Sequence, residues 1–253
     1  MGSIYESAQI KSETFELFHE LCAFTDDTVM TVAVADALLN NLPYASNMQK
    51  WGRKYPNAGY GVSFYHWLFS KDPKPYNSWG NGAAMRVSPI GFAFSTIEEV
   101  KKEAGRSAAV SHNHPEGIKG AQAAAAAVYY ARFYKDKEKI RSLIQDEFGY
   151  DLNRTAEEIR KDYQFDGSCQ KSVPEAIVAF LDSKSFEDAI RKAVSLGGDS
   201  DTQACIAGGI AEAYYGYAPA EIEKKTRCYL PAEMLTLIDE FYEKYQLKKE
   251  PAS

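Results

Sequence analysis

The sequence predicts an all-α protein folded as one compact domain of roughly ten to twelve helices. Three observations support this prediction. Apolar residues recur at helical spacing through most of the chain, and capping residues precede several of these stretches. Alternating strands joined by hairpin turns are missing. The 253 residues are enough for one large domain, and no linker-like stretch divides them.

The expected helices follow one another along the chain. Val29–Leu39 repeats apolar residues at helical spacing, and Pro115–Tyr134 contains an alanine run with high helix propensity. Thr96 and Thr155 each precede a glutamate three positions later, which is the capping-box pattern. Further helices are expected from Ser172, with Pro174 in the first turn, over Ser185–Ser195, over Thr202–Tyr215, and from Leu230 to about Tyr245. Lys71–Gly82, rich in Pro, Asn and Gly, is the clearest irregular loop.

Composition excludes several classes of protein. The net charge is −6 and no basic stripe is present, which argues against a dedicated nucleic-acid binder. No apolar stretch reaches the roughly 18 residues of a membrane span. The N-terminus lacks a basic region followed by an apolar run, so we do not expect a secretory signal. The four cysteines form no CxxC pair, which favours reduced thiols. We therefore expect a cytoplasmic protein that does not bind membranes, and a monomer.

Two acidic clusters stand at expected helix starts. The first is Thr25-Asp26-Asp27-Thr28. The second is Gly197–Thr202 (GGDSDT), which contains Asp199, Asp201 and Thr202. Each cluster by itself is typical of an N-cap followed by carboxylates that favour the helix dipole. Both, however, place two carboxylates and a hydroxyl at the mouth of an apolar helix that should pack in the core. Four gathered carboxylates repel one another unless cations neutralise them.

Oxygen ligands of this kind suit magnesium, manganese or calcium rather than zinc. An EF-hand loop starting at Asp199 fits poorly, because its twelfth position is Ile210 instead of glutamate. A phosphatase motif of the Asp-x-Asp-x-Thr type also fits poorly, because Gln203 stands at the fifth position and no α/β pattern precedes it.

Six segments together resemble the ADP-ribosylglycohydrolase family, which includes the dinitrogenase-reductase-activating glycohydrolases. In chain order they are Gly2–Glu6 (GSIYE), Phe24–Met30 (FTDDTVM), Gly80–Arg86 (GNGAAMR), Ser111-His112, Ser172–Ala176 (SVPEA) and Ser195–Thr202 (SLGGDSDT). They occur in the family's order and span nearly the whole chain. Family members usually carry a glycine-rich helix before the position of Gly2, so we expect a single domain over 1–253 that lacks this first helix.

The resemblance implies a cleft holding two magnesium ions, with manganese as an alternative. The implied metal ligands are Thr25, Asp26, Asp27, Asp199, Asp201 and Thr202. Glu6 and Asp27 are the implied catalytic residues. The implied substrate-binding residues are Asn77, Ser78, Trp79, Gly80, Asn81, Gly82, Met85 and His112. Glycines in this loop let backbone N–H groups approach a pyrophosphate, and an aromatic ring such as Trp79 can stack on adenine.

The resemblance further implies a hydrolase that cleaves the glycosidic bond between ADP-ribose and an acceptor and releases ADP-ribose as product. The acceptor could be a protein side chain, a modified nucleic acid or a small molecule. Gly2–Glu6 is similar to the acidic loop of the serine-directed branch. Two other classes stay open: a non-catalytic ADP-ribose-binding or structural family member, and another metal-dependent phosphohydrolase.

Overall fold

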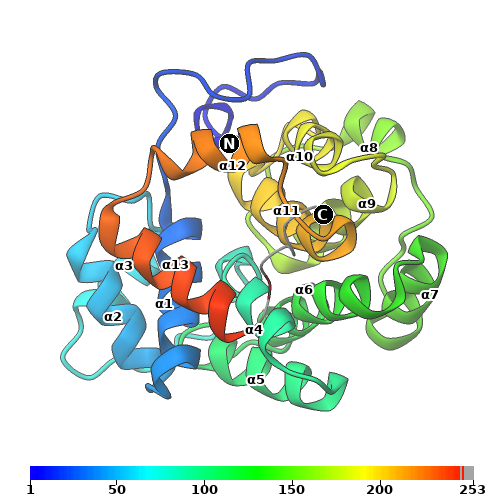
Figure 1. Cartoon of the computed structure of the whole chain (residues 1–253). Helices are drawn as coiled ribbons and strands as arrows, with labels where there is room; N and C mark the ends of the chain where they lie inside the picture. Colours follow the sequence, from blue (N-terminus) through cyan, green and yellow to red (C-terminus); the bar gives the residue numbers. More distant parts are fainter. Residues whose placement is uncertain (246, 248–253) are drawn as a thin grey trace.

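The computed structural model describes residues 1–245 and 247, and their regular structure is helical, as predicted. Thirteen α-helices and two short 3₁₀ helices make up this part of the chain, slightly more helices than expected. The one β-bridge among these residues joins Gly80 to Ser168. Figure 1 shows α1, α2, α3 and α13 on one side of the molecule and α7 to α10 on the other.

The elements are, in chain order, η1 (Ser3–Tyr5), α1 (Asp26–Asn40), α2 (Tyr44–Lys54), α3 (Val62–Phe69), η2 (Asn81–Ala83), α4 (Ser88–Ala93), α5 (Ile97–Ala109), α6 (Pro115–Tyr134), α7 (Lys137–Phe148), α8 (Ala156–Asp162), α9 (Cys169–Leu181), α10 (Phe186–Ser195), α11 (Ser200–Tyr215), α12 (Ala220–Arg227) and α13 (Ala232–Lys244).

Helix α6 lies at the centre of the core and packs against α4, α5, α7, α9 and α11. Its alanine run is buried on nearly every side, which is the pattern of a helix surrounded by other helices. Small side chains let these neighbours approach closely. A Cβ added to Gly91 of α4 would lie 2.6 Å from Val128 Cβ, and one added to Gly120 would lie 2.5 Å from Cys169 Sγ.

The capping predictions are confirmed at Thr155 and in part at Thr96. Thr155 forms the complete capping box with Glu158, whereas the Thr96 hydroxyl accepts a hydrogen bond from the Glu99 N–H. The predicted start of α9 is wrong. The helix begins at Cys169, so Pro174 lies inside it rather than in its first turn. Cys169 packs against Gly120 of α6, which favours the early start, although an interior proline removes one backbone hydrogen bond and crowds the carbonyl four residues earlier.

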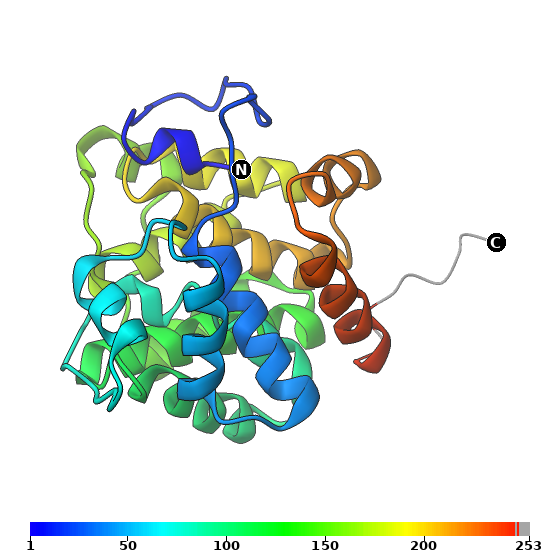
Figure 2. The same cartoon turned by 90° about the vertical axis from the view of Figure 1, so that its left-hand side faces the viewer.

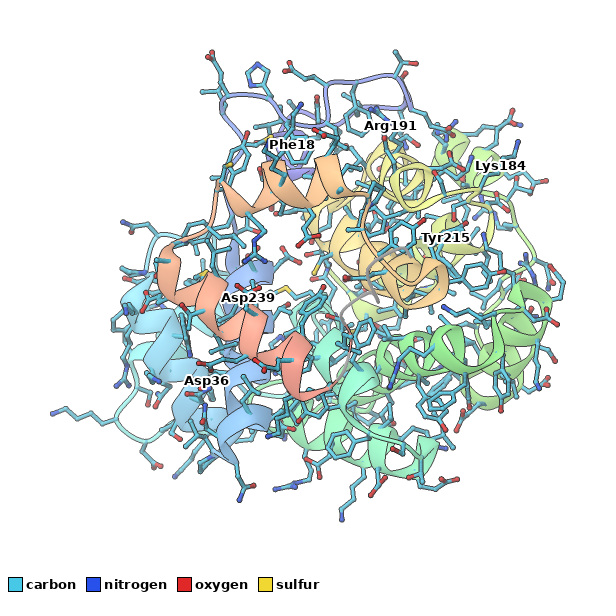
Figure 3. All side chains as sticks on the ribbon, viewed as in Figure 1. Phe18, Asp36, Lys184, Arg191, Tyr215 and Asp239 are labelled. Carbon is cyan, nitrogen blue, oxygen red and sulfur yellow. The ribbon has the colours of Figure 1, made fainter. Side chains whose placement is uncertain are left out.

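Side-chain hydrogen bonds hold the elements that reach the site. Asp36 of α1, labelled in Figure 3, lies on the side of the molecule that carries α1 and α2. It accepts from Trp51 Nε1 over 2.7 Å and from Lys50 Nζ over 3.2 Å, which fixes α2 on α1. The N-terminal segment crosses one end of the molecule, above the start of α1 (Figure 2). Arg191 of α10 donates to the Phe15 carbonyl over 2.8 Å and holds this segment in place.

In the part of the chain that the structure describes, no helix has both the length and the apolar character that crossing a membrane requires.

Replacing Gly91 by alanine should destabilise the fold. The new Cβ would lie 2.6 Å from Val128 Cβ and 2.7 Å from the Ala125 carbonyl, so α4 and α6 would have to separate. Overpacking of this kind costs about 1–3 kcal/mol of unfolding free energy. Urea unfolding measures the loss, with Gly61→Ala as the control, because a Cβ at Gly61 would meet nothing within 4 Å. Equal unfolding midpoints for the two variants would contradict the close α4–α6 contact.

Candidate active site

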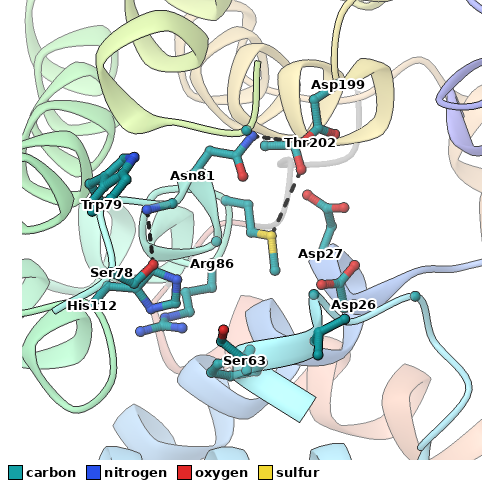
Figure 4. Close-up of a pocket in the computed structure, with 18 of the residues that line it drawn as sticks. Asp26, Asp27, Ser63, Ser78, Trp79, Asn81, Arg86, His112, Asp199 and Thr202 are labelled. Carbon is teal, nitrogen blue, oxygen red and sulfur yellow. Dashed lines mark hydrogen bonds between the residues drawn. The ribbon is translucent and has the colours of Figure 1, made fainter. Parts of the chain in front are cut away.

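A cavity of about 550 Å³ opens where α1, α11 and the loop before η2 meet (Figure 4). Such a volume suits a nucleotide-sized ligand. All of the predicted site residues line this cavity except Thr25. The structure thus brings together side chains that are almost 200 positions apart in the sequence, from Glu6 to Thr202.

The starts of α1 and α11 supply the acidic end of the cavity. Figure 4 shows Asp26 and Asp27 on one side and Asp199 and Thr202 on the other. Neither N-cap residue, Thr25 or Asp199, makes a side-chain capping hydrogen bond. The Thr25 hydroxyl instead donates to Asp27 Oδ2 over 3.0 Å. The structure therefore does not show the simple capping roles that each cluster by itself would favour.

Glu6 joins this acidic end from the N-terminal segment. Carboxylate oxygens of Glu6, Asp199 and Asp201 lie within 4.8 Å of one another. Asp199 and Asp201 are each only 8% exposed, whereas Glu6 is exposed at the rim. The approach of the segment depends on Gly2, which has a φ of 96° and whose carbonyl accepts from Ser200 Oγ over 3.0 Å. A Cβ on Gly2 would lie 3.0 Å from the Ser200 carbonyl.

Burial and mutual repulsion make these carboxylates hard to ionise. Burial, followed by the charges of Asp201 and Asp199, raises the pKa of Asp26 to about 7. The same two causes, burial first and then Asp201, raise the pKa of Asp27 well above its ordinary value. Burial also raises the pKa of Asp199 to about 7, although a hydrogen bond from Asn81 opposes the rise. Burial and then Asp201 raise the pKa of Glu6.

Two carboxylate oxygens of the acidic cluster accept no hydrogen bond from the described residues. Asp27 Oδ1 and Asp201 Oδ1 are buried and have no hydrogen-bond partner in the described part of the chain. A buried, unpartnered carboxylate oxygen is costly unless a cation or a donor satisfies it. The residues therefore fit one or more hard cations, for which carboxylate and hydroxyl oxygens are the usual ligands.

The loop before η2 forms the opposite end of the cavity, and backbone hydrogen bonds anchor it to the start of α9. The Asn81 N–H donates to the Gly167 carbonyl over 2.8 Å, and the Cys169 N–H donates to the Trp79 carbonyl over 2.9 Å. Asn81 also ties the loop to the acidic end, because its Nδ2 donates to Asp199 Oδ2 over 2.8 Å. Trp79 remains 52% exposed at the cavity mouth.

Several residues that line the cavity are absent from the sequence prediction. They are Gly59, Gly61, Val62, Ser63, Phe64, Tyr76, Arg86, Phe165 and Gly167. Phe165, which is 47% exposed, is a second aromatic residue on the cavity beside Trp79. It lies between α8 and α9 with no local motif to mark it. Arg86 ends the GNGAAMR segment, which marks this region of the sequence as part of the site. The segment does not indicate a role for Arg86 itself.

The chain belongs to the ADP-ribosylglycohydrolase family, whose model matches residues 2–251. It is 30% identical to the ADP-ribosylhydrolase ARH3 of Homo sapiens over 262 residues, which cover 78% of this chain and 72% of the relative. It is 26% identical to the ADP-ribosylarginine hydrolase Tri1 of Pseudomonas putida (strain GB-1), over 79% of this chain and 62% of the relative.

The fold is similar to that of a solved structure described as an ADP-ribosylglycohydrolase-related protein complex. The TM-score is 0.68 at 23% sequence identity, and the match covers 95% of this chain and 93% of that chain. At this identity the likeness concerns the fold. Together with the family match, it confirms the all-α architecture that the sequence predicts.

In metal-free buffer the protein should lose stability as the pH rises from about 5.5 to 8. The folded pKa of Asp26 and of Asp199 is about 7, against an ordinary value of 3.8, so the folded state binds these protons more tightly than the unfolded state. The resulting stabilisation is complete below the ordinary value and is lost as the pH passes through about 7. Thermal unfolding in EDTA should show a shift of about 2–4 °C for each kcal/mol lost.

Asp199→Asn should flatten this pH dependence, whereas Asp72→Asn should leave it unchanged, because Asp72 is an exposed loop residue. A melting temperature that rises between the two pH values in the wild-type protein would show that the cluster is not protonated as described.

Proposed function

We propose that this protein is a magnesium-dependent ADP-ribosyl hydrolase, which cleaves the glycosidic bond between ADP-ribose and an acceptor and releases ADP-ribose. The observation that carries the proposal is the gathering of Asp26, Asp27, Asp199 and Asp201 at one end of a nucleotide-sized cavity whose other end is a glycine-containing loop. Membership of the ADP-ribosylglycohydrolase family supports it.

Two magnesium ions, or manganese in their place, would be held by Asp26, Asp27, Asp199, Asp201 and Thr202. The unpartnered oxygens of Asp27 and Asp201 support this assignment. Thr25 remains a proposed ligand, although its hydroxyl donates to Asp27 and its side chain does not line the cavity. When bound, such ions stabilise negative charge and orient oxygen groups, including water.

The opposite end of the cavity would bind the ADP portion of the substrate. Trp79 and Phe165 are half-exposed aromatic residues on one cavity, where either ring could stack on adenine. Gly80 and Gly82 leave the loop backbone without side-chain cover, so its N–H groups can approach a pyrophosphate. His112 lies next to these glycines and offers a further polar contact.

The reaction would break the bond between C1″ of the distal ribose and the acceptor atom through an oxocarbenium-like state. Water adds to C1″, its proton leaves, and the acceptor atom takes up a proton. Glu6 would move one of these protons; its position at the rim beside Asp199 and Asp201 and its raised pKa support this role. Asp27 would hold the reacting groups at the buried end of the cavity.

The acceptor linkage is the finer part of the proposal. The Gly2–Glu6 segment and the similarity to ARH3 favour a serine-linked substrate. The arginine-directed relative from Pseudomonas putida makes an arginine linkage the competing candidate. A nucleic acid would enter only as a modified substrate. The cytoplasmic location and the monomeric state remain predictions from the sequence.

The purified protein should release ADP-ribose from a serine-linked ADP-ribosyl peptide with magnesium and should stop when EDTA is added. Asp201→Ala should lower turnover by about 100-fold or more, because charge stabilisation in the site would be lost. Glu6→Gln should lower it by about 100-fold or more through loss of proton transfer. Glu16→Gln, in the same N-terminal segment but exposed outside the cavity, is the matched control.

Turnover that is equal with magnesium and with EDTA would contradict the metal-dependent mechanism. Arginine-linked peptide cleaved in preference to serine-linked peptide would correct the acceptor. Tight ADP-ribose binding without turnover would favour a non-catalytic binder, and phosphate release from nucleotides instead of ADP-ribose release would favour a phosphohydrolase.

A further inference from the structure

Arg86 is a buried cation with no carboxylate partner among the described residues. Its side chain is 0% exposed, and Nε and Nη1 have no hydrogen-bond partner there. Burial lowers the pKa of Arg86 to about 10, so the group stays charged at neutral pH. Its Nη2 donates to the Ser107 carbonyl over 2.9 Å and to Ser111 Oγ over 3.1 Å. Burying an unpaired charge at this depth costs folding free energy, so a functional role for Arg86 would explain its presence.

Ser111 links Arg86 to His112. Ser111 Oγ lies 2.8 Å from His112 Nδ1, and Ser111 is fully buried. Because the oxygen already accepts from Arg86, its single hydrogen is free to be donated. Among the described residues, the other contact of this oxygen is the Arg86 donor, so Nδ1 is the acceptor available to that hydrogen. If Nδ1 accepts, the neutral ring must carry its own hydrogen on Nε2.

The free nitrogen of His112 faces the loop that would bind the ligand. A Cβ on Gly82 would lie 3.3 Å from Nε2, and a Cβ on Gly80 would lie 3.5 Å from it. The ring is fixed between Phe64 and Tyr76, whose centroids lie 5.9 and 5.7 Å away. Burial, and then the Arg86 cation, lower the pKa of His112 well below its ordinary value, so the ring is neutral.

We propose that Arg86 and Ser111 are positioning residues, which hold His112 in the neutral tautomer with its hydrogen on Nε2. The ring then always presents an N–H donor above Gly80 and Gly82. The opposite tautomer would present a lone pair there and repel an anionic oxygen. This inference rests on the proposed function for the identity of that oxygen, which belongs to the diphosphate of ADP-ribose.

The tautomer can be measured directly in the ligand-free protein. Long-range ¹H–¹⁵N correlation NMR distinguishes the two ring nitrogens, and His112→Gln assigns the signals. We expect the wild-type spectrum to show Nδ1 unprotonated and Nε2 protonated. Ser111→Ala should give a mixture of tautomers and about fivefold to tenfold weaker ADP-ribose binding by calorimetry, which corresponds to the loss of about one hydrogen bond. Arg86→Met should mix the tautomers too, because the hydroxyl of Ser111 would no longer be oriented.

Ser107→Ala is the matched control, since it removes a buried serine hydroxyl that has no hydrogen-bond partner among the described residues and leaves the backbone carbonyl to Arg86. It should keep both the tautomer and the affinity. A wild-type ring with its hydrogen on Nδ1, or an unchanged tautomer in Ser111→Ala, would overturn the inference. Because the NMR measurement needs no ligand, failure of the wild-type protein to bind ADP-ribose would refute the proposed function separately.

Discussion

Repulsion among carboxylates buried at two helix starts is the constraint to which the rest of the structure responds. Asp27, Asp199 and Asp201 are nearly inaccessible to water, so their charges are poorly screened. The N-termini of α1 and α11 offset part of this cost, because each helix start carries a partial positive charge. The remaining cost explains the raised pKa values of Asp26 and Asp199 and favours bound cations.

Such a cluster requires rigid surrounding helices, because repulsion would otherwise push the carboxylates apart. The surrounding helices provide this rigidity through close packing of small residues, above all in the alanine run of α6. The N-terminal segment contains only the three-residue η1, and the loop before η2 contains no helix, so neither is positioned by a helix of its own. Hydrogen bonds to fixed elements position them instead: Arg191 holds the former, and the backbone of Gly167 and Cys169 holds the latter.

The cavity is electrically asymmetric, and this asymmetry matches the ligand that we propose. One end carries the acidic cluster, where cations and the hydroxyl groups of a ribose can be accommodated. Toward the other end lie the buried cation of Arg86 and the neutral ring of His112, which suit an anionic diphosphate. Asn81 connects the two ends, because its side chain donates to Asp199 while its backbone begins η2, directly after the loop.

The sequence by itself determined the helical class, the capping box at Thr155 and the identity of the acidic clusters, because these depend on local periodicity and local hydrogen bonds. The sequence did not determine that Thr25 and Asp199 lack side-chain capping hydrogen bonds, because this depends on which groups face each helix start. The start of α9 was likewise set by packing of Cys169 against α6. Phe165 lines the same cavity as Trp79, and Arg86 contacts Ser111, although these residues are distant in the sequence. Only tertiary packing brings such groups together.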